Sequence, residues 1–227
     1  MELTGKRALI TGGTRGIGAA ITRDFARHGV HLAINSRHED DAAKEMLAEL
    51  ADCQAKAHFV SADMAKPDEV SRCVDRAVEV LGGLDILVHN AGGPSPGTIE
   101  ACSPEQWMHT FDVHVHAAYH LCRRALPHLR KNAEGAILLM SSVAGIRGCP
   151  GAIAYGTVKG AIAQFTRMLA RDVADDNIRV NCLAPGIIRT RFHEAMSADA
   201  KAHNLANRIS LHREGTADDV AQVAQLL

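Results

Sequence analysis

The feature that most constrains the fold of this chain is the alternation of short apolar runs with longer amphipathic segments. The apolar runs have the length of strands and occupy residues 7–11, 30–35, 56–61, 84–90, 136–140 and 178–183. A helical pattern follows each of the first five, at 16–28, 39–51, 67–81, 106–130 and 155–175, and another covers 217–227. Apolar strands separated by helices predict a parallel sheet with helices on both faces. Right-handed crossovers make this a doubly wound α/β fold, which binds ligands at the carboxyl ends of its strands.

The composition suits one globular domain over residues 1–227, with 47% hydrophobic and 22% charged residues. A net charge of -1 provides no field that would draw the chain to nucleic acid or anionic lipid. No apolar run reaches the roughly 18 residues of a membrane helix, and the N-terminus lacks the pattern of a signal peptide. The six cysteines include no CxxC pair and fit reduced thiols, so we expect a cytoplasmic protein.

A glycine-rich loop, TGGTRGIG, joins the first predicted strand to the first predicted helix. Gly12 lets the chain turn sharply, Gly16 lets the backbone approach a pyrophosphate, and Gly18 lets the helix pack close to the sheet. The helix N-terminus offers free N–H groups and a positive partial charge to the anion. Glycine-rich turns also serve geometry alone, but the flanking strand and helix favour a nucleotide site. The predicted site comprises Gly12, Thr14, Arg15, Gly16, Ile17 and Gly18.

Four further motifs accompany this GxxxGxG spacing. Asn90-Ala91-Gly92 follows the fourth strand, Ser142 precedes Tyr155 by thirteen residues, Lys159 follows Tyr155 by four, and Pro185-Gly186 follows the sixth strand. In this order and spacing, the sequence resembles the short-chain dehydrogenase/reductase family from Lys6 to its last residue. The resemblance implies a Rossmann-type domain and hydride transfer between a nicotinamide cofactor and a carbonyl or alcohol carbon.

The end of the second predicted strand indicates which nicotinamide cofactor is used. An NAD enzyme places a carboxylate there for the ribose hydroxyl, whereas an NADP enzyme places a cation for the 2′-phosphate. This chain has Ser36 and Arg37 at that position and no acid. Arg37 can fork onto phosphate oxygens, and the resemblance directs Arg15 to the same pocket. Both arginines could instead be ordinary surface residues, but together they favour NADP(H).

The resemblance assigns further cofactor contacts along the carboxyl edge of the sheet. Asp63 and Met64, after the third strand, would meet the adenine. The strand end near the nicotinamide ribose would be shaped by Asn90, Ala91 and Gly92, and Tyr155 and Lys159 would hold that ribose. The segment lining the nicotinamide would include Pro185, Gly186, Ile188 and Thr190.

The predicted chemistry rests on Ser142, Tyr155 and Lys159. An isolated tyrosine ionises near ~10, and a neighbouring ammonium favours its phenolate. Residues four apart share one face of a helix, so Lys159 can tune Tyr155 as acid/base. Ser142 would donate to the substrate oxygen as charge grows on it. Ser141 is the rival serine, but its side chain should point to the other side of the strand.

His114 stands where the family resemblance expects an asparagine whose backbone carbonyl holds a water beside the lysine. Either the histidine carbonyl serves equally, or the larger ring displaces that water. We therefore include His114 among the predicted catalytic residues. His116 and His120 are four apart on a helix, as zinc ligands can be, but no third ligand is evident and the reaction needs no metal.

Two readings compete with an enzyme acting on a small polar substrate. One is an NADP-binding sensor without catalysis, and the other is a reductase of 3-oxoacyl groups on an acyl-carrier protein. The resemblance expects arginines for the acidic carrier where this chain has Ala133 and Asp176. We therefore favour a small molecule such as a sugar, sugar acid or polyol, which Arg191 and His193 could meet beneath a mobile lid at 192–208.

The resemblance also implies a homo-oligomer, a dimer or tetramer. The helices predicted at 106–130 and 155–175 would pair across one two-fold axis. A seventh strand would build the other interface, and the sequence printed here ends at Leu227 before that strand.

Overall fold

A computed structural model describes residues 1–193 and 196–226, apart from the side chain of His193. Its sheet has six parallel strands in the order β3-β2-β1-β4-β5-β6, which confirms the predicted doubly wound topology. The strands are β1 (Arg7–Thr11), β2 (His31–Ser36), β3 (Ala57–Ser61), β4 (Ile86–His89), β5 (Gly135–Met140) and β6 (Ile178–Leu183). They form where short apolar runs let both faces of the sheet be covered.

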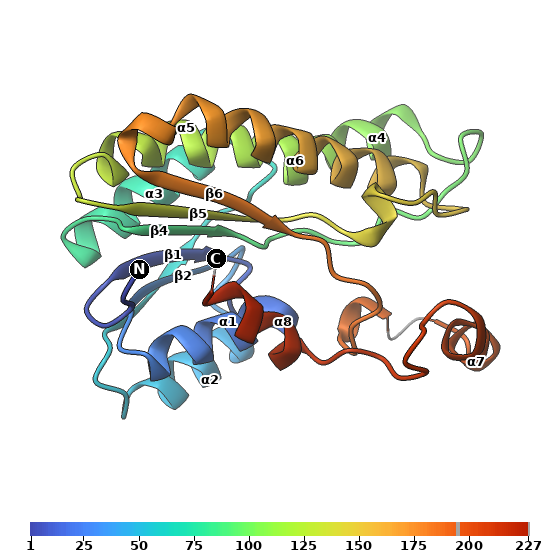
Figure 1. Cartoon of the computed structure of the whole chain (residues 1–227), viewed down its shortest axis with the longest axis horizontal. Helices are drawn as coiled ribbons and strands as arrows, with labels where there is room; N and C mark the ends of the chain where they lie inside the picture. Colours follow the sequence, from blue (N-terminus) through green and yellow to red (C-terminus); the bar gives the residue numbers. More distant parts are fainter. Residues whose placement is uncertain (194–195, 227) are drawn as a thin grey trace.

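Helices cover both faces of this sheet, as Figure 1 shows. One face carries α1 (Gly16–Arg27), α2 (Asp41–Leu50) and α8 (Ala217–Ala224). The other carries α3 (Pro67–Leu81), α4 (Pro104–Phe111), α5 (Ala117–Leu129) and α6 (Ile153–Asp172). Each face has its own apolar core, because alternate side chains of every strand point to opposite sides. None of the described helices is long and apolar enough to cross a lipid bilayer.

The strand order reverses between β1 and β4, and the loops that follow these two strands meet there. Gly12, after β1, lies against Ala91, after β4. In doubly wound sheets, such a reversal leaves a crevice at the carboxyl ends of the strands. The α7 helix (Ala198–Asn207) stands on this side, beyond the arrowheads of the strands in Figure 1. The fold thus gathers the predicted site at one edge of the sheet.

The single helix predicted at 106–130 is divided into three parts. Ser103 caps α4 by accepting a hydrogen bond from the N–H of Gln106. A π-helical segment, η1 (Asp112–His116), then interrupts the helix before α5 continues it. One extra residue in a turn shifts the side chains that follow, and such segments frequently occur at functional sites. Here the π-helical turn contains His114.

The predicted lid is described only in part. A short helical turn at Arg191–His193 begins the segment, and α7 forms most of the rest. Residues 194 and 195 lie outside the described residues, as do the side chain of His193 and Leu227, the expected end of the last helix.

Candidate active site

The glycine-rich loop closes tightly against the strands and leaves the start of α1 uncapped by any side chain. Gly12 has φ +62°, in the left-handed region that favours glycine. A Cβ on Gly18 would collide with the carbonyl oxygen of Gly12. The Asn90 side chain donates to that carbonyl over 3.1 Å, which joins the loop to the end of β4. Arg15 precedes α1 without forming a side-chain cap, so the first N–H groups of the helix can bind an anion.

The predicted 2′-phosphate pocket contains an ion pair that the sequence analysis did not anticipate. The Arg15 guanidinium lies 2.7 Å from the Asp40 carboxylate, and both side chains are well exposed. Asp40 also caps α2 by accepting from the N–H of Ala43, and Arg15 lowers the pKa of Asp40. Arg37 is exposed and forms no ion pair within the described residues, whereas the Ser36 hydroxyl donates to the carbonyl of His38. Arg37 is therefore the cation that is free to meet a phosphate.

The end of β3 is held by hydrogen bonds from the loop and from α3. One carboxylate oxygen of Asp63 accepts from the N–H of Ala65 over 2.9 Å, and Glu69 accepts from the N–H of Asp63 over 2.8 Å. Met64 is buried beneath them. The predicted adenine contacts thus lie on a fixed turn, and Glu69 is a supporting residue that the sequence did not single out.

Ser142, Tyr155 and Lys159 converge at the end of β5 and the start of α6. The Lys159 ammonium lies 5.6 Å from the centre of the Tyr155 ring and donates to the carbonyl of Met140 over 2.7 Å. Ser142 lies close enough to Tyr155 for its side chain to lower the pKa of the phenol. The backbone at Ser142 is extended, and the Ala144 N–H donates to its hydroxyl oxygen over 3.2 Å. The three predicted groups are therefore in mutual reach.

Burial shifts the ionisation of both titratable groups of this set. Burial raises the pKa of Tyr155, and the Ser142 side chain partly offsets this rise. Burial also lowers the pKa of Lys159 to about 7, because a charged ammonium is costly away from water. Lys159 is thus poised between its charged and neutral forms near neutral pH. Ser141 has a different environment, since its hydroxyl donates to the carbonyl of Lys159 over 2.7 Å inside the core.

The segment after β6 lies beside both the nucleotide loop and Tyr155. The carbonyl of Pro185 accepts from the N–H of Val143, which fixes the segment to the turn after Ser142. Ile188 is buried, and the side chain of Thr190 lies next to Gly16. The next turn brings the Phe192 ring 5.5 Å from the ring of Tyr155. This segment therefore spans the predicted nicotinamide region from the loop to the tyrosine.

Two buried histidines stand beside this set. The His114 ring lies edge-on to Tyr155, with centres 6.0 Å apart and planes at 82°. The carbonyl of His114, expected to hold a water, lies 3.3 Å from Nε2 of His89. The sequence analysis did not predict a role for His89, although a histidine inside an apolar strand just before Asn-Ala-Gly could have indicated one. Lys159 lowers the pKa of both histidines, in addition to the larger effect of burial.

The other histidine pair on this helical region has local partners. His116 lies 2.7 Å from the Asp112 carboxylate, and the His120 ring packs against Tyr119. Within residues 1–193 and 196–226, no three His, Cys, Asp or Glu side chains are grouped to hold a metal ion.

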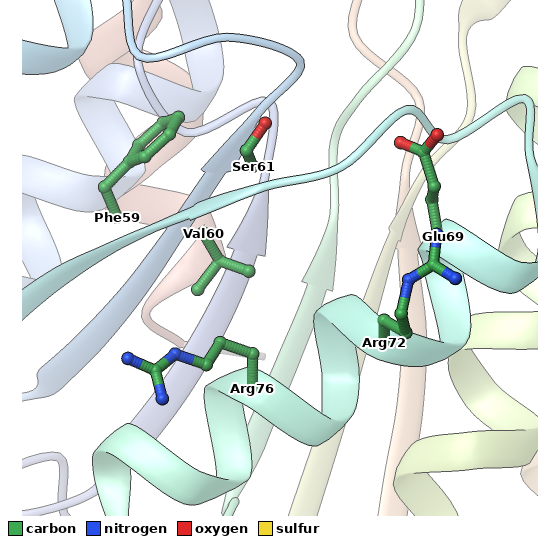
Figure 2. A pocket seen from close by; sticks show the side chains of 6 residues that line it. All are labelled: Phe59, Val60, Ser61, Glu69, Arg72 and Arg76. Atoms are coloured by element: carbon green, nitrogen blue, oxygen red, sulfur yellow. The ribbon is translucent and has the colours of Figure 1, made fainter.

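A separate hollow of about 380 Å³ opens between the edge strand β3 and α3 (Figure 2). Its lining residues are Phe59, Val60, Ser61, Glu69, Arg72 and Arg76. These residues belong to β3 and α3, whereas Tyr155 and Lys159 lie on α6, so this hollow is not the predicted substrate site.

Comparisons with known proteins agree with this arrangement. A family model for short chain dehydrogenases matches residues 6–201. A 3-oxoacyl-(acyl-carrier-protein) reductase from Chlamydia muridarum is 35% identical, over 99% of this chain and 90% of the relative. A short chain dehydrogenase from Burkholderia cenocepacia J2315, solved with NADP, is 35% identical with a TM-score of 0.92, over 100% of this chain and 91% of that one. The L-sorbose reductase of Gluconobacter frateurii, solved with NADPH and L-sorbose, is 31% identical with a TM-score of 0.90, over 99% and 90%.

The chain therefore belongs to the short chain dehydrogenase family, as its motifs predicted. Membership in this family makes it an oxidoreductase. The relatives differ in the substrates that their names state, although their identities to this chain are similar.

Proposed function

We propose that this protein transfers a hydride between NADP(H) and the carbonyl or alcohol carbon of a small polar substrate, with Tyr155 as the acid/base. The observation that carries the proposal is the convergence of Ser142, Tyr155 and Lys159 beside an open helix N-terminus. NADP(H) fits the residues present, because Arg37 is free to bind a 2′-phosphate and the strand end carries no acid. Two solved relatives are bound to NADP or NADPH.

The residues divide the chemistry between proton transfer and charge stabilisation. NADP(H), when bound, supplies or accepts the hydride. In the reducing direction, Tyr155 donates its phenolic proton to the substrate oxygen, and in the oxidising direction it accepts that proton. The Ser142 hydroxyl donates a hydrogen bond to the same oxygen and stabilises the charge that develops there. Lys159, in its charged form, favours the phenolate of Tyr155 and would hold the ribose of the bound cofactor.

A small polar substrate is favoured by the surface that a carrier protein would meet. Ala133 supplies no charge, and Asp176 carries the sign that repels an acidic carrier. Arg130 lies 2.8 Å from the Asp176 carboxylate, so this cation is already paired. The similarity to L-sorbose reductase is consistent with a sugar-like substrate.

A 3-oxoacyl-(acyl-carrier-protein) reductase is the second candidate, and one observation favours it. The C. muridarum relative that bears this name matches 99% of the chain at 35% identity. A panel with NADPH would separate the two candidates: ketoses, sugar acids and polyols on one side, and a 3-oxoacyl group on its carrier or on a short thiol on the other. Faster turnover of the carrier-linked substrate would replace the first proposal by the second.

Tyr155→Phe tests the proposed acid/base in either case. The variant should bind NADPH like the parent but turn over ~10²–10⁴ times more slowly, because a positioned proton donor is lost. Steady-state kinetics on the best substrate of the panel, with NADPH binding measured by fluorescence, would check this. Turnover within a few-fold of the parent would contradict the role of Tyr155, and NADPH binding without turnover of any substrate by the parent would indicate a sensor.

A further inference from the structure

A chain of hydrogen bonds begins at the end of β1 and sets the tautomer of a buried histidine. The Thr11 hydroxyl oxygen accepts from the N–H groups of Asn90 and Ala91, each over 3.2 Å. These two donors fill its two lone pairs, so its own hydrogen is donated elsewhere. The remaining partner is Nδ1 of His89, 2.8 Å away. Nδ1 of His89 is therefore the acceptor, and Nε2 carries the proton.

The same chain continues from His89 into the π-helical segment. Nε2 of His89 lies 3.3 Å from the backbone carbonyl of His114 and donates to it. Nε2 of His114 lies 3.3 Å from the carbonyl of Gly93, and it must be the donor because a carbonyl only accepts. Both histidines are only 3% exposed. The Nε2–H of His89 thus ties the end of β4 to the π-helical segment, and the Nε2–H of His114 ties the following loop to the same segment.

The last ring of the chain contacts the proposed acid/base. The His114 ring packs edge-on to Tyr155, 6.0 Å between centres. A Cβ on Gly92 would collide with the His114 ring, so the ring also lies directly against the loop after β4. Burial and the charge of Lys159 keep both histidines neutral, as the acceptor role of Nδ1 in His89 requires.

We propose that His89 is a positioning residue that holds the π-helical segment, and with it the His114 ring, against Tyr155. This role depends on the hydrogen bond that the Nε2–H of His89 donates to the carbonyl of His114. A buried histidine that only fills space would need its volume, whereas this role needs a donor at one end of the ring. The inference rests on the proposed function of Tyr155.

Two substitutions of His89 distinguish its role as a hydrogen-bond donor from its role in filling space. Asparagine places its side-chain oxygen where Nδ1 lies, so His89→Asn keeps an acceptor for Thr11 but cannot reach the carbonyl of His114. Glutamine reaches as far as Nε2, so His89→Gln keeps a donor for that carbonyl. We expect similar losses of melting temperature in both. We expect kcat to fall on the order of tenfold in His89→Asn and to stay within about threefold in His89→Gln.

The pH profile supplies a readout that packing alone would not change. In His89→Asn, Tyr155 is held less firmly, so the ammonium of Lys159 should stabilise its phenolate less. The pH at half-maximal oxidation should therefore rise, while KM for NADP should stay near that of the parent. If the two variants match in kcat and in pH profile, the proposal is overturned. If Tyr155→Phe proves fully active, the proposed function fails instead, and the two failures are distinguishable.

Thr11 offers a second test if His89→Asn does not fold. Thr11→Val keeps the shape but removes the hydroxyl that fixes the His89 tautomer and accepts from the N–H groups of Asn90 and Ala91, whereas Thr11→Ser retains that hydroxyl. The serine variant should keep kcat near the parent value, and the valine variant should show the loss expected of His89→Asn. Equal kcat in the two Thr11 variants would count against the proposal.

Discussion

Arg15 already pairs with Asp40, whose carboxylate lies 2.7 Å from the guanidinium and competes with a 2′-phosphate for its charge. Asp40→Asn removes the competing charge and retains a side-chain oxygen that can cap α2. We expect KM for NADPH to fall roughly two- to fivefold, in the range of exposed ion pairs. KM for NADH should change little, because NADH lacks the phosphate that Arg15 would meet. Steady-state kinetics with both cofactors would check this.

Arg37→Ala is the matched opposite change in the same pocket. Removing a charge-assisted partner of the phosphate should weaken NADPH about tenfold or more and leave NADH nearly unchanged. Equal weakening of both cofactors would make Arg37 structural. If Asp40→Asn alters NADH and NADPH alike, the ion pair acts on the fold of the loop and not on the phosphate.

The buried ammonium of Lys159, which the proposed chemistry uses, lowers the free energy of unfolding. Its pKa is about 7 in the folded protein and near its ordinary value of 10.5 in the unfolded chain. The unfolded chain thus binds more protons between these values, so this group favours folding as pH rises from about 7 to about 10.5. Below pH 7 its buried charge lowers the free energy of unfolding most.

Lys159→Met should therefore stabilise the cofactor-free protein while abolishing turnover. The gain in the free energy of unfolding should be largest below pH 7 and should narrow from pH 7 to 10.5. Denaturant unfolding at several pH values would measure it. A gain that does not vary with pH would mean that the ammonium is not the source of the cost.

Part of the candidate site could be predicted because its groups sit at fixed offsets within single elements. Lys159 follows Tyr155 by one helical turn and Ser142 ends a buried strand, but the roles of these residues and the cofactor contacts came from the family resemblance. Contacts between different helices, strands and loops could not be predicted from spacing in the sequence. Nothing in the pattern around Asp40 shows that its carboxylate reaches Arg15, since that pairing depends on how two loops cross.

At the scale of elements, the π-helical segment is the main departure from the predicted fold. The stretch around His114 has the period of a helix, and the sequence indicates one helix from 106 to 130. The extra residue in the turn accompanies tertiary contacts from His89 and Gly93. Local periodicity cannot register such contacts, because they join segments more than twenty residues apart. The strands, by contrast, were readable because each is apolar along its length.

Substituting alanine for Gly92 or Gly93 tests how closely the loop after β4 packs against the His114 ring. A Cβ at Gly92 would overlap the His114 ring, whereas a Cβ at Gly93 would meet open space. We expect Gly92→Ala to lower the free energy of unfolding by about 1–3 kcal/mol, as overpacked cores do. Gly93→Ala should stay within about 0.5 kcal/mol of the parent. Equal effects in denaturant titrations would mean that the ring moves aside freely.

At the scale of the whole molecule, the layer of α4, α5 and α6 presents large apolar side chains to its surroundings. Met108 is 52% exposed, Tyr119 45% and Met168 54%, each on a different one of these helices. Figure 1 shows the three helices together in the layer above the sheet. Exposed apolar side chains gathered on one face mark interfaces, and a two-fold axis lets the same face pair with itself.

We therefore expect a homodimer through this layer at micromolar concentration. Met168→Asp should weaken it, because the dimer would bury a charge without a partner. Val223→Asp is the control, since Val223 is 43% exposed on α8, which covers the other face of the sheet. Light scattering of the parent and both variants would decide. A monomeric parent would contradict the interface, and so would a Met168→Asp protein that assembles like the parent while Val223→Asp does not.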